Sequence, residues 1–366
     1  MPRICLNMIV RNEAHVIERC LASVRPFVDA WAIVDTGSTD GTQALIRGAL
    51  ADLPGELHER PWKDFGHNRT EAIQLAMPLG DYVFTIDADD TLCLPEGYVR
   101  PPLTADAYAL YLDHAGLRYT RLCLVSSRRP WRWVGVLHEY LDCGEPMPGV
   151  LLRGPTLAFG GDGARSQQDM RAKYAADAML LEAALRQEPD NARYVFYLAQ
   201  SYRDANQPGA ALAHYERRAG MGGWDEEVFQ SLYQAALLAE RLEEPFGSVM
   251  DRYLRAFEFR PCRGGEALGQ LARLCRERQR HVAARLFAAQ AMTIPMPNDS
   301  LFVDPSWYRW RCRDEFAVAG YWTGDMESCR RISEQLLAEG VLPEVERERI
   351  LANVRLAAEK LAQRKG

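Results

Sequence analysis

Residues 81–90, DYVFTIDADD, run from an apolar stretch straight into three carboxylates, and they decide the fold of the first part of the chain. The apolar run predicts a buried strand that ends close to Asp87, Asp89 and Asp90. Carboxylates this close repel one another and lose hydration as they leave water. The sequence therefore predicts a compensating cation, or a carboxyl group with a raised pKa, at the end of this strand.

Asp87 and Asp89 lie two residues apart, a spacing that places both side chains on the same side of an extended strand. Two converging carboxylates suit a hard divalent cation, because Mg²⁺ takes one or two protein carboxylates together with substrate phosphates. A single Asp would be explained by a cap or a turn. The pair predicts a site for Mn²⁺ or Mg²⁺.

The length and composition of the chain indicate a globular protein of two domains. Its 366 residues exceed one ordinary core, and a hydrophobic share of 48% with a charged share of 26% excludes a disordered or fibrous protein. The net charge of -6 gives no general electrostatic reason to bind a polyanion. Nucleic acid is therefore disfavoured as a partner.

Cysteine usage and hydropathy predict a cytoplasmic protein. Nine cysteines are scattered singly, without a CxxC pair or a zinc spacing, which indicates reduced thiols. No stretch approaches the roughly 20 apolar residues of a transmembrane segment. The first residues, MPRICLNMIVRNE, lack the apolar length and the cleavage site of a signal peptide.

The two halves of the chain differ in their periodicity. Residues 1–150 alternate short apolar strands with amphipathic helices, which predicts an α/β domain around a mostly parallel sheet. Residues 151–168 are rich in glycine and proline and predict a loop-rich junction. In residues 169–366 strand signals vanish and helical signals recur in pairs, which predicts an all-α domain.

The helical half repeats itself. Aligning FYLAQSYRDANQPGAALAHYERRA with SLYQAALLAERLEEPFGSVMDRYLRA places Leu198 over Leu232, 34 positions later. A helix pair of this period, with small and aromatic residues at set positions, resembles the tetratricopeptide repeat. The positions that fit the pattern are Ala199, Tyr202, Ala211 and Tyr215. An irregular helical bundle is the alternative.

The first half resembles the nucleotide-binding half of the family 2 glycosyltransferases. The resemblance covers residues 3–95 and rests on IVRNE, VDTGSTDGT and DFGHNRTEAIQLAMPLGDYVFTIDADD, in that order. It implies a GT-A fold, which is a Rossmann-like nucleotide-sugar-binding domain, and a UDP-sugar donor. Ligands of open α/β sheets sit outside the carboxyl ends of the strands, where these segments end.

The resemblance also implies the donor-binding residues. It assigns Asp35 to the uracil ring, places Arg69 near the diphosphate and makes Asn68 a base or ribose contact. A solvated Arg on an amphipathic helix is the alternative for Arg69. The remaining predicted donor contacts at the strand ends are Val10, Arg11, Asn12, Glu13, Asp87, Ala88 and Asp89.

The segment WVGVLHEYL provides the candidates for a base and a further metal ligand. The resemblance implies a late histidine that completes the metal site and an acidic residue near the acceptor as base, but the usual ED base motif of the family is missing here. The candidates are therefore His138 as a third metal ligand beside Asp87 and Asp89 or as a phosphate contact, Glu139 as the catalytic base, and Asp90 as the weaker alternative base. In a strand, His138 and Glu139 would point to opposite faces. A structural histidine is the alternative for His138.

A glycine-rich turn, GGDGARSQQDM, precedes the helical half. Such a turn at a helix start can cradle an anion through backbone N–H groups and a guanidinium. Arg165 and Ser166 are therefore predicted to close over the diphosphate, and a flexible linker is the alternative.

A GT-A-like domain followed by tetratricopeptide-like repeats resembles a subset of family 2 enzymes that includes the peptide S-glycosyltransferases of glycopeptide bacteriocins. The resemblance implies a metal-dependent, inverting transferase that moves a hexose, by family default glucose, to a hydroxyl or thiol. The acceptor would be a peptide, protein or glycan held by the repeats, and a homodimer is compatible with this arrangement. The alternatives are a transferase for modified DNA bases and a non-catalytic nucleotide-sugar-binding repeat protein.

Overall fold

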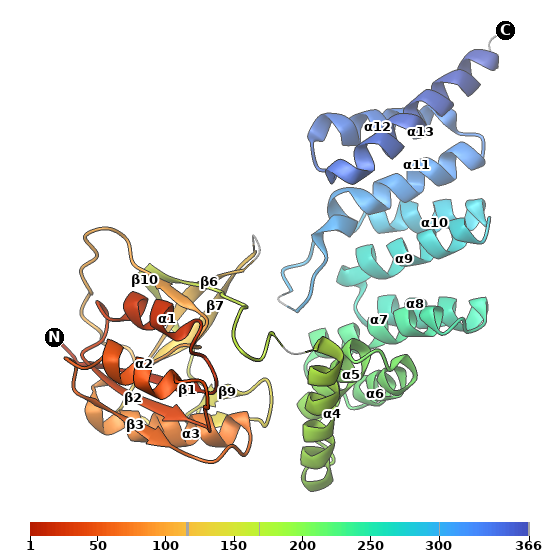
Figure 1. Ribbon diagram of the computed structural model, residues 1–366. Coiled ribbons are helices and arrows are strands. Elements are labelled where there is room, and N and C mark those ends of the chain that lie inside the picture. Colours follow the sequence, from red (N-terminus) through yellow and green to blue (C-terminus); the bar gives the residue numbers. More distant parts are fainter. Residues whose placement is uncertain (115–116, 168, 300, 365–366) are drawn as a thin grey trace. The chain divides into compact units, whose positions relative to one another are not determined.

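The structure is a computed structural model that describes residues 1–114, 117–167, 169–299 and 301–364. Its contacts divide the chain into two compact units, Met1–Pro189 and Asp190–Gly366. The first unit contains an α/β sheet domain, and the second is made of paired helices (Figure 1). The predicted fold class is confirmed.

The first unit is built on an eight-stranded sheet with the strand order β3-β2-β1-β4-β7-β6-β10-β5, beside a two-stranded sheet of β8 and β9. The strands are β1 (Ile4–Val10), β2 (Ala30–Asp35), β3 (Gly55–Glu59), β4 (Tyr82–Thr85), β5 (Thr91–Cys93), β6 (Ala107–His114), β7 (Leu117–Ser126), β8 (Arg132–Val134), β9 (Tyr140–Asp142) and β10 (Val150–Ala158). The helices of this unit are α1 (Ile17–Val24), α2 (Thr42–Ala49), α3 (Phe65–Ala76), the short η1 (Met77–Leu79) and α4 (Met170–Gln187).

Strands β3, β2, β1 and β4 are parallel, and the chain order reverses between β1 and β4. β1 lies between β2 and β4, with Val10 beside Asp35 at one end and Asn7 beside Thr85. A reversal of this kind opens a crevice at the carboxyl ends of the strands. The loops after β1, β2 and β4 therefore meet at one edge of the sheet.

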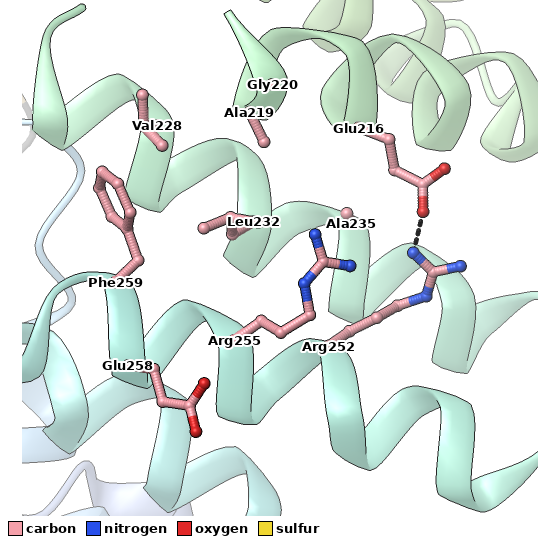
Figure 2. A pocket seen from close by; sticks show the side chains of 10 residues that line it. All are labelled: Glu216, Ala219, Gly220, Val228, Leu232, Ala235, Arg252, Arg255, Glu258 and Phe259. Atoms are coloured by element: carbon pink, nitrogen blue, oxygen red, sulfur yellow. Dashed lines mark hydrogen bonds and ion pairs between the residues drawn. The ribbon is translucent and has the colours of Figure 1, made fainter. Parts of the chain in front are cut away.

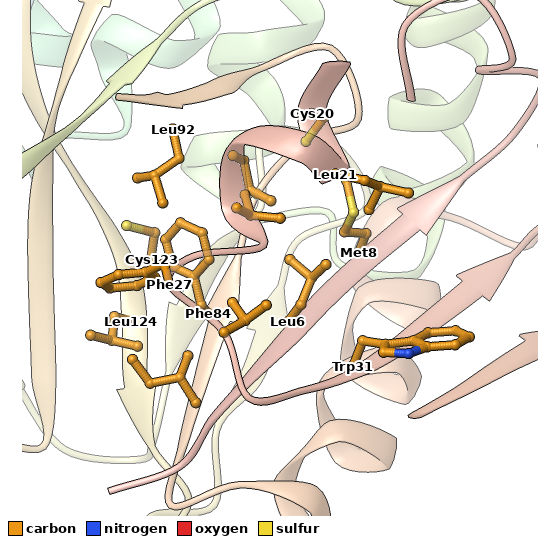
Figure 3. Close-up of a cluster of buried hydrophobic side chains, with 14 of the residues drawn as sticks. Leu6, Met8, Cys20, Leu21, Phe27, Trp31, Phe84, Leu92, Cys123 and Leu124 are labelled. Carbon is orange, nitrogen blue, oxygen red and sulfur yellow. The ribbon is translucent and has the colours of Figure 1, made fainter. Parts of the chain in front are cut away.

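Alternating residues of β1 build a core on each face of the sheet, as the two-residue period of a strand dictates. Leu6 and Met8 pack with Cys20 and Leu21 of α1 on one face, where Phe84 of β4 joins them (Figure 3). Cys5 belongs to the cluster on the opposite face, which contains residues of α3. The sheet is thus buried on both sides, which holds its edge loops on a rigid base.

Two sequence-based expectations about this unit are corrected. β4 ends at Thr85, and the chain turns between Asp87 and Asp90, whose N–H donates to the Asp87 carbonyl. Asp87 and Asp89 are therefore not alternate positions of one strand. The predicted junction 151–168 contains β10, which pairs with β6 and β5, so Gly154 and Pro155 lie within the sheet and only the glycines from Gly160 onward lie in a loop.

The second unit consists of successive antiparallel helix pairs, labelled in Figure 1. Its helices are α5 (Ala192–Asp204), α6 (Pro208–Gly220), α7 (Asp225–Arg241), α8 (Phe246–Phe259), η2 (Pro261–Arg263), α9 (Gly264–Glu277), α10 (His281–Met292), η3 (Trp307–Arg311), α11 (Cys312–Trp322), α12 (Met326–Glu339) and α13 (Glu344–Gln363). The repeat residues Ala199, Ala211 and Tyr215 are fully buried in its core. Stacked pairs of this kind match the predicted repeat.

The boundary between the units lies later than the sequence suggested. The all-α domain was expected to begin at residue 169, but α4 belongs to the first compact unit, which ends at Pro189. In the described part of the chain, none of the helices has the length and apolarity that crossing a membrane requires.

Candidate functional site

A pocket of about 650 Å³ opens at the carboxyl edge of the parallel strands. Its lining comes from five parts of the first unit, namely the end of β1 with the loop after it, Thr36 after β2, the loop before α3 with the start of that helix, the turn after β4, and residues 163–166 together with α4. The lining residues predicted as donor contacts are Val10, Arg11, Asn12, Glu13, Arg69, Asp87, Ala88, Asp89, Arg165 and Ser166. The structure therefore brings most of the predicted site together.

The loop after β1 is fixed to the loop after β2 by paired hydrogen bonds. The Asn12 N–H donates to Ser38 Oγ at 2.8 Å, and Asn12 Oδ1 accepts from the Thr39 N–H at 2.8 Å. Asn12 has a left-handed φ of 58°, which asparagine tolerates better than most residues. The Glu13 N–H donates to Thr42 Oγ1 at 2.9 Å. These bonds position the Glu13 carboxylate at the pocket.

Asp35 ends β2 and is buried, with 1% of its surface exposed. Its Oδ1 accepts hydrogen bonds from the Gly37 and Ser38 N–H groups at 2.9 and 2.8 Å. Its Oδ2 is buried without a partner among the residues that the structure describes. A buried acceptor left unpaired is costly, so this oxygen is a candidate for a ligand N–H.

Asp87 is held between two arginines beneath the pocket. Its Oδ1 lies 2.5 Å from Arg69 Nη2, and its Oδ2 lies 2.8 Å from Arg121 Nη2. Burial alone would raise the pKa of Asp87, but the Arg121 and Arg69 guanidiniums outweigh it and hold that pKa well below its usual range. Both oxygens are thus already neutralised by protein cations, which differs from the predicted metal-ligand role.

Asp90 lies behind Asp87 and is 1% exposed. Its Oδ2 lies 3.0 Å from Arg121 Nη1. Burial and the neighbouring Asp87 and Asp89 carboxylates raise the pKa of Asp90 to about 7, against the opposing effect of Arg121. The DADD sequence predicted a carboxyl group with a raised pKa, and in the structure Asp90 is such a group. Asp90 is not among the residues that line the pocket.

Asp89 points away from the arginines and toward the segment that follows β10. The Gly163 N–H donates to Asp89 Oδ2 at 3.2 Å, and the Ala164 N–H donates to Glu13 Oε2 at 3.1 Å. A Cβ on Gly163 would lie 3.0 Å from Asp89 Oδ2 and 3.3 Å from Glu13 Oε2. The two carboxylates therefore converge on one backbone position, where glycine allows the close approach.

The chemistry of these donors fits a divalent cation at Asp89. Neither Asp89 nor Glu13 has an ion-pair partner in the described parts of the chain, and both line the pocket. Burial is the main cause that raises the pKa of Glu13, and Asp89 adds to it. A hard cation would relieve this repulsion, with substrate phosphates completing its coordination.

The predicted set of three protein ligands does not assemble. No group of three His, Cys, Asp or Glu side chains is arranged to hold a metal ion within residues 1–114, 117–167, 169–299 and 301–364. His138 is exposed, has a left-handed φ of 52° and lies outside the pocket lining. The chain turns at His138 between β8 and β9, so the strand geometry assumed for this segment does not apply.

Glu139 is linked to the pocket through Arg69. Its Oε1 lies 2.7 Å from Arg69 Nε, so the two side chains form an ion pair. The Nε–H group of Arg69 makes no hydrogen bond among the described residues. The Arg69 guanidinium also lies over the Trp133 ring, 5.0 Å from its centroid. Arg69 is thus a fixed cation on the pocket wall and not a solvated helix residue. Glu139 itself does not line the pocket.

Asn68 has a structural role in place of the predicted base or ribose contact. It is fully buried, its Oδ1 accepts from the Lys63 N–H at 2.9 Å, and its Nδ2 donates to the Pro61 carbonyl at 3.1 Å. Both ends of the amide are therefore used to shape the loop before α3. That loop places Trp62 and Phe65 on the pocket wall, with ring centroids 4.7 Å apart.

Sequence reasoning missed several residues of this site. Arg121 lies within β7, and its signal was a charged residue directly before the apolar run LCLV, since a charged residue there is rarely buried unless it is paired. Trp62 and Phe65 flank the start of α3, but nothing local marks them as pocket residues. Asp177 and Leu180 of α4 lie in the half of the sequence that was assigned to the repeats.

The sequence of this chain is similar to those of known proteins. Residues 5–95 match the model of glycosyl transferase family 2, a range that contains β2, β3 and β4 and the turn with Asp87 and Asp89. A TPR repeat-containing protein of Synechococcus elongatus is 30% identical over 276 residues, which cover 70% of this chain and 66% of that protein.

Several relatives are named as glycosyltransferases. The SPbeta prophage-derived glycosyltransferase SunS of Bacillus subtilis is 25% identical over 229 residues, 59% of this chain and 53% of that protein. The lipopolysaccharide core biosynthesis glycosyltransferase LpsC of Rhizobium meliloti is 32% identical over 96 residues, 25% of this chain and 34% of that protein. The chain spans about two thirds of the first relative, at 66%, and about half of SunS, at 53%.

Proposed function

We propose, from the premise that this chain combines a family 2 glycosyl transferase domain with tetratricopeptide-like repeats, that it is a metal-dependent, inverting glycosyltransferase. The donor is a UDP-sugar, with glucose as the family default. The acceptor is a hydroxyl or thiol of a peptide, protein or glycan.

The observation that carries this proposal is the separation of charge in the pocket. Glu13 and Asp89 line it without an ion-pair partner among the described residues, while Arg69 and Arg165 line it as cations. A nucleoside diphosphate with its divalent cation has the complementary charges, because the cation suits the carboxylates and the phosphates suit the guanidiniums. The unpaired Oδ2 of Asp35 would accept the ring N–H of uracil.

The proposed reaction is a single displacement at the anomeric carbon. A base takes the proton from the acceptor hydroxyl or thiol, and the acceptor atom bonds to the anomeric carbon as the bond to the UDP oxygen breaks. Asp89 would hold the divalent cation, which would supply neutralisation of the charge that develops on UDP. Glu139 stays the predicted base, with Asp90 as the alternative, and Arg69 orients Glu139 and Asp87 from between them.

The repeats are proposed to hold the acceptor. A groove of about 490 Å³ runs along α6, α7 and α8 in the second unit (Figure 2). Its floor carries Val228, Leu232 and Ala235 of α7, and its rim carries the paired Glu216 and Arg252. An apolar floor with a charged rim suits an extended partner such as a peptide.

Calorimetry of UDP binding tests the donor assignment. UDP should bind at least about tenfold more tightly with Mn²⁺ or Mg²⁺ than with EDTA, and Asp89→Ala should remove that difference because it removes the proposed metal ligand. Glu18→Gln, which removes an exposed charge of α1, is the control and should behave as wild type. Equal UDP affinity with and without metal in the wild type would refute metal dependence.

Transfer itself is tested by mass spectrometry. Peptides with free serine and cysteine, and glycan acceptors, would be incubated with UDP-glucose and Mn²⁺. A hexose mass added to one acceptor class supports the proposal and identifies the acceptor chemistry. UDP binding without transfer to any class, or without hydrolysis of UDP-sugar, would favour the non-catalytic alternative.

A further inference from the structure

Arg165 is held at the pocket by two partners from different elements. Its guanidinium lies over the Phe65 ring at the start of α3, 4.6 Å from the centroid. It also forms an ion pair and hydrogen bond with the Asp177 carboxylate of α4. All three residues line the pocket. Arg165 therefore occupies a defined place there, which a flexible linker residue would not.

Asp177 is the fixed member of this pair. Its residue is 7% exposed, and it lies on an 18-residue helix whose first turn is capped by Asp169. The Arg165 side chain is 36% exposed and belongs to the segment between β10 and α4. Because an arginine side chain has several rotatable bonds, its guanidinium can change partner while the carboxylate stays in place.

The position of Arg165 in the chain places it close to the proposed diphosphate. Its two preceding residues, Gly163 and Ala164, donate backbone hydrogen bonds to Asp89 and Glu13. A cation held by Asp89 would bring donor phosphates to this side of the pocket. A phosphate and a carboxylate compete for the same forked guanidinium, and a diphosphate carries more charge than one carboxylate.

We infer that Asp177 is a positioning residue that binds the Arg165 guanidinium in the free protein. When the donor binds, the guanidinium leaves Asp177 and binds the donor phosphates. This inference rests on the proposed function, since it requires a nucleotide diphosphate in the pocket. The pair must break before Arg165 binds phosphate, so Asp177 lowers the affinity for phosphate-bearing ligands. A ligand without phosphate leaves the pair intact. The pocket thereby discriminates by charge in addition to base recognition.

The test compares UDP with uridine by calorimetry, in the full-length chain with Mn²⁺ present. Asp177→Asn keeps the shape of the side chain and removes its charge. It should tighten UDP binding about threefold to tenfold and leave uridine binding unchanged. In an Arg165→Ala background, which itself binds UDP more weakly, the same substitution should have no effect. Glu18→Gln controls for the loss of one negative charge elsewhere in the first unit.

Each other outcome overturns the inference. Asp177→Asn that weakens UDP and uridine alike would show that the pair only supports the fold, and unchanged UDP affinity would show that Arg165 does not leave Asp177. Tighter UDP binding that persists without Arg165 would indicate a general charge effect. If the wild-type chain binds no UDP, the donor assignment falls and this inference falls with it.

Discussion

Two of the buried clusters of arginine and carboxylate among the described residues differ in whether their hydrogen bonds are complete. In the repeat unit, Arg263 is fully buried, and its Nε and Nη2 bond both oxygens of Glu266. Its other N–H groups reach Asp299 and the carbonyls of Leu301 and Phe302. All five donors of this guanidinium have acceptors.

The cluster beneath the pocket is incomplete by comparison. Asp87 is bonded by Arg69 and Arg121, but the Asp89 and Glu13 carboxylates form no ion pair within the described residues, and Asp35 Oδ2 has no hydrogen bond there. Both clusters use the same residue types. The difference indicates that a completed cluster stabilises a fold, while an incomplete one at a pocket leaves groups for a ligand to satisfy.

The largest expected effect is on the rate of transfer and concerns the incomplete cluster beneath the pocket. Glu139→Gln keeps the size of the side chain and removes the proton-accepting charge, so kcat should fall by about 10²–10⁴ with nearly unchanged affinity for UDP and metal. Glu71→Gln on α3 is the matched control, because Glu71 also pairs with an arginine, Arg60, at 2.7 Å, but this arginine does not line the pocket as Arg69 does. Steady-state kinetics and calorimetry measure both quantities.

The alternative assignment has a distinct signature. If Glu139→Gln turns over near the wild-type rate while Asp90→Asn is inactive and still binds UDP, the base is Asp90. In that case the ion pair of Glu139 with Arg69 serves only to hold the guanidinium.

A substitution in the complete cluster around Arg263 should change the stability of the repeat unit and not ligand binding. Glu266→Ala leaves Arg263 buried without its main partner, which should cost about 3–5 kcal/mol in the free energy of unfolding of the repeat unit. Glu277→Gln removes a surface partner of Arg273 and should cost less than about 1 kcal/mol. Denaturant unfolding followed by far-UV circular dichroism measures both. UDP affinity that falls together with stability would contradict the separation of roles.

The smallest expected effect is a pH dependence of the free energy of unfolding, caused by Asp90 in the incomplete cluster beneath the pocket. The pKa of Asp90 is raised to about 7, mainly by burial and by Asp87, so the folded chain keeps this proton where the unfolded chain has lost it. This carboxyl group therefore favours folding at about pH 4 and loses that contribution as the pH rises to about 7. Relative to wild type, the free energy of unfolding of the Asp90→Asn variant should increase by about 1–2 kcal/mol between about pH 4 and pH 8. A difference that stays constant over this range would mean that Asp90 titrates normally.

Periodicity and motif order were enough to predict the fold. The parallel strands β1, β2 and β4 are apolar runs, and the repeats recur at a fixed period, so both were found locally. β3 was missed, because Gly55–Glu59 is a partly exposed edge strand with little apolar character. β10 was missed, because Gly154 and Pro155 interrupt a strand whose register shifts at that point.

The site could be predicted only as a set of segments. The position of Asp87 was identified, but its partner Arg121 is 34 residues away on β7, which reaches it by antiparallel pairing with β4. Side-chain direction also depended on where β4 ends, and nothing in FTIDADD marks Thr85 as its last residue. Pairing partners and strand ends are set by tertiary contacts, which a local pattern does not contain.

The place of α4 has a consequence for dividing this chain. Asp177 and Leu180 line the pocket, and α4 continues to Gln187, so a cut at the glycine-rich turn would remove one wall of the pocket. The seam that leaves both units whole lies at Pro189 and Asp190. On the proposed function, grafting a different helical array after Pro189 would exchange acceptor preference and leave the proposed nucleotide site intact, which would make the repeats an interchangeable module.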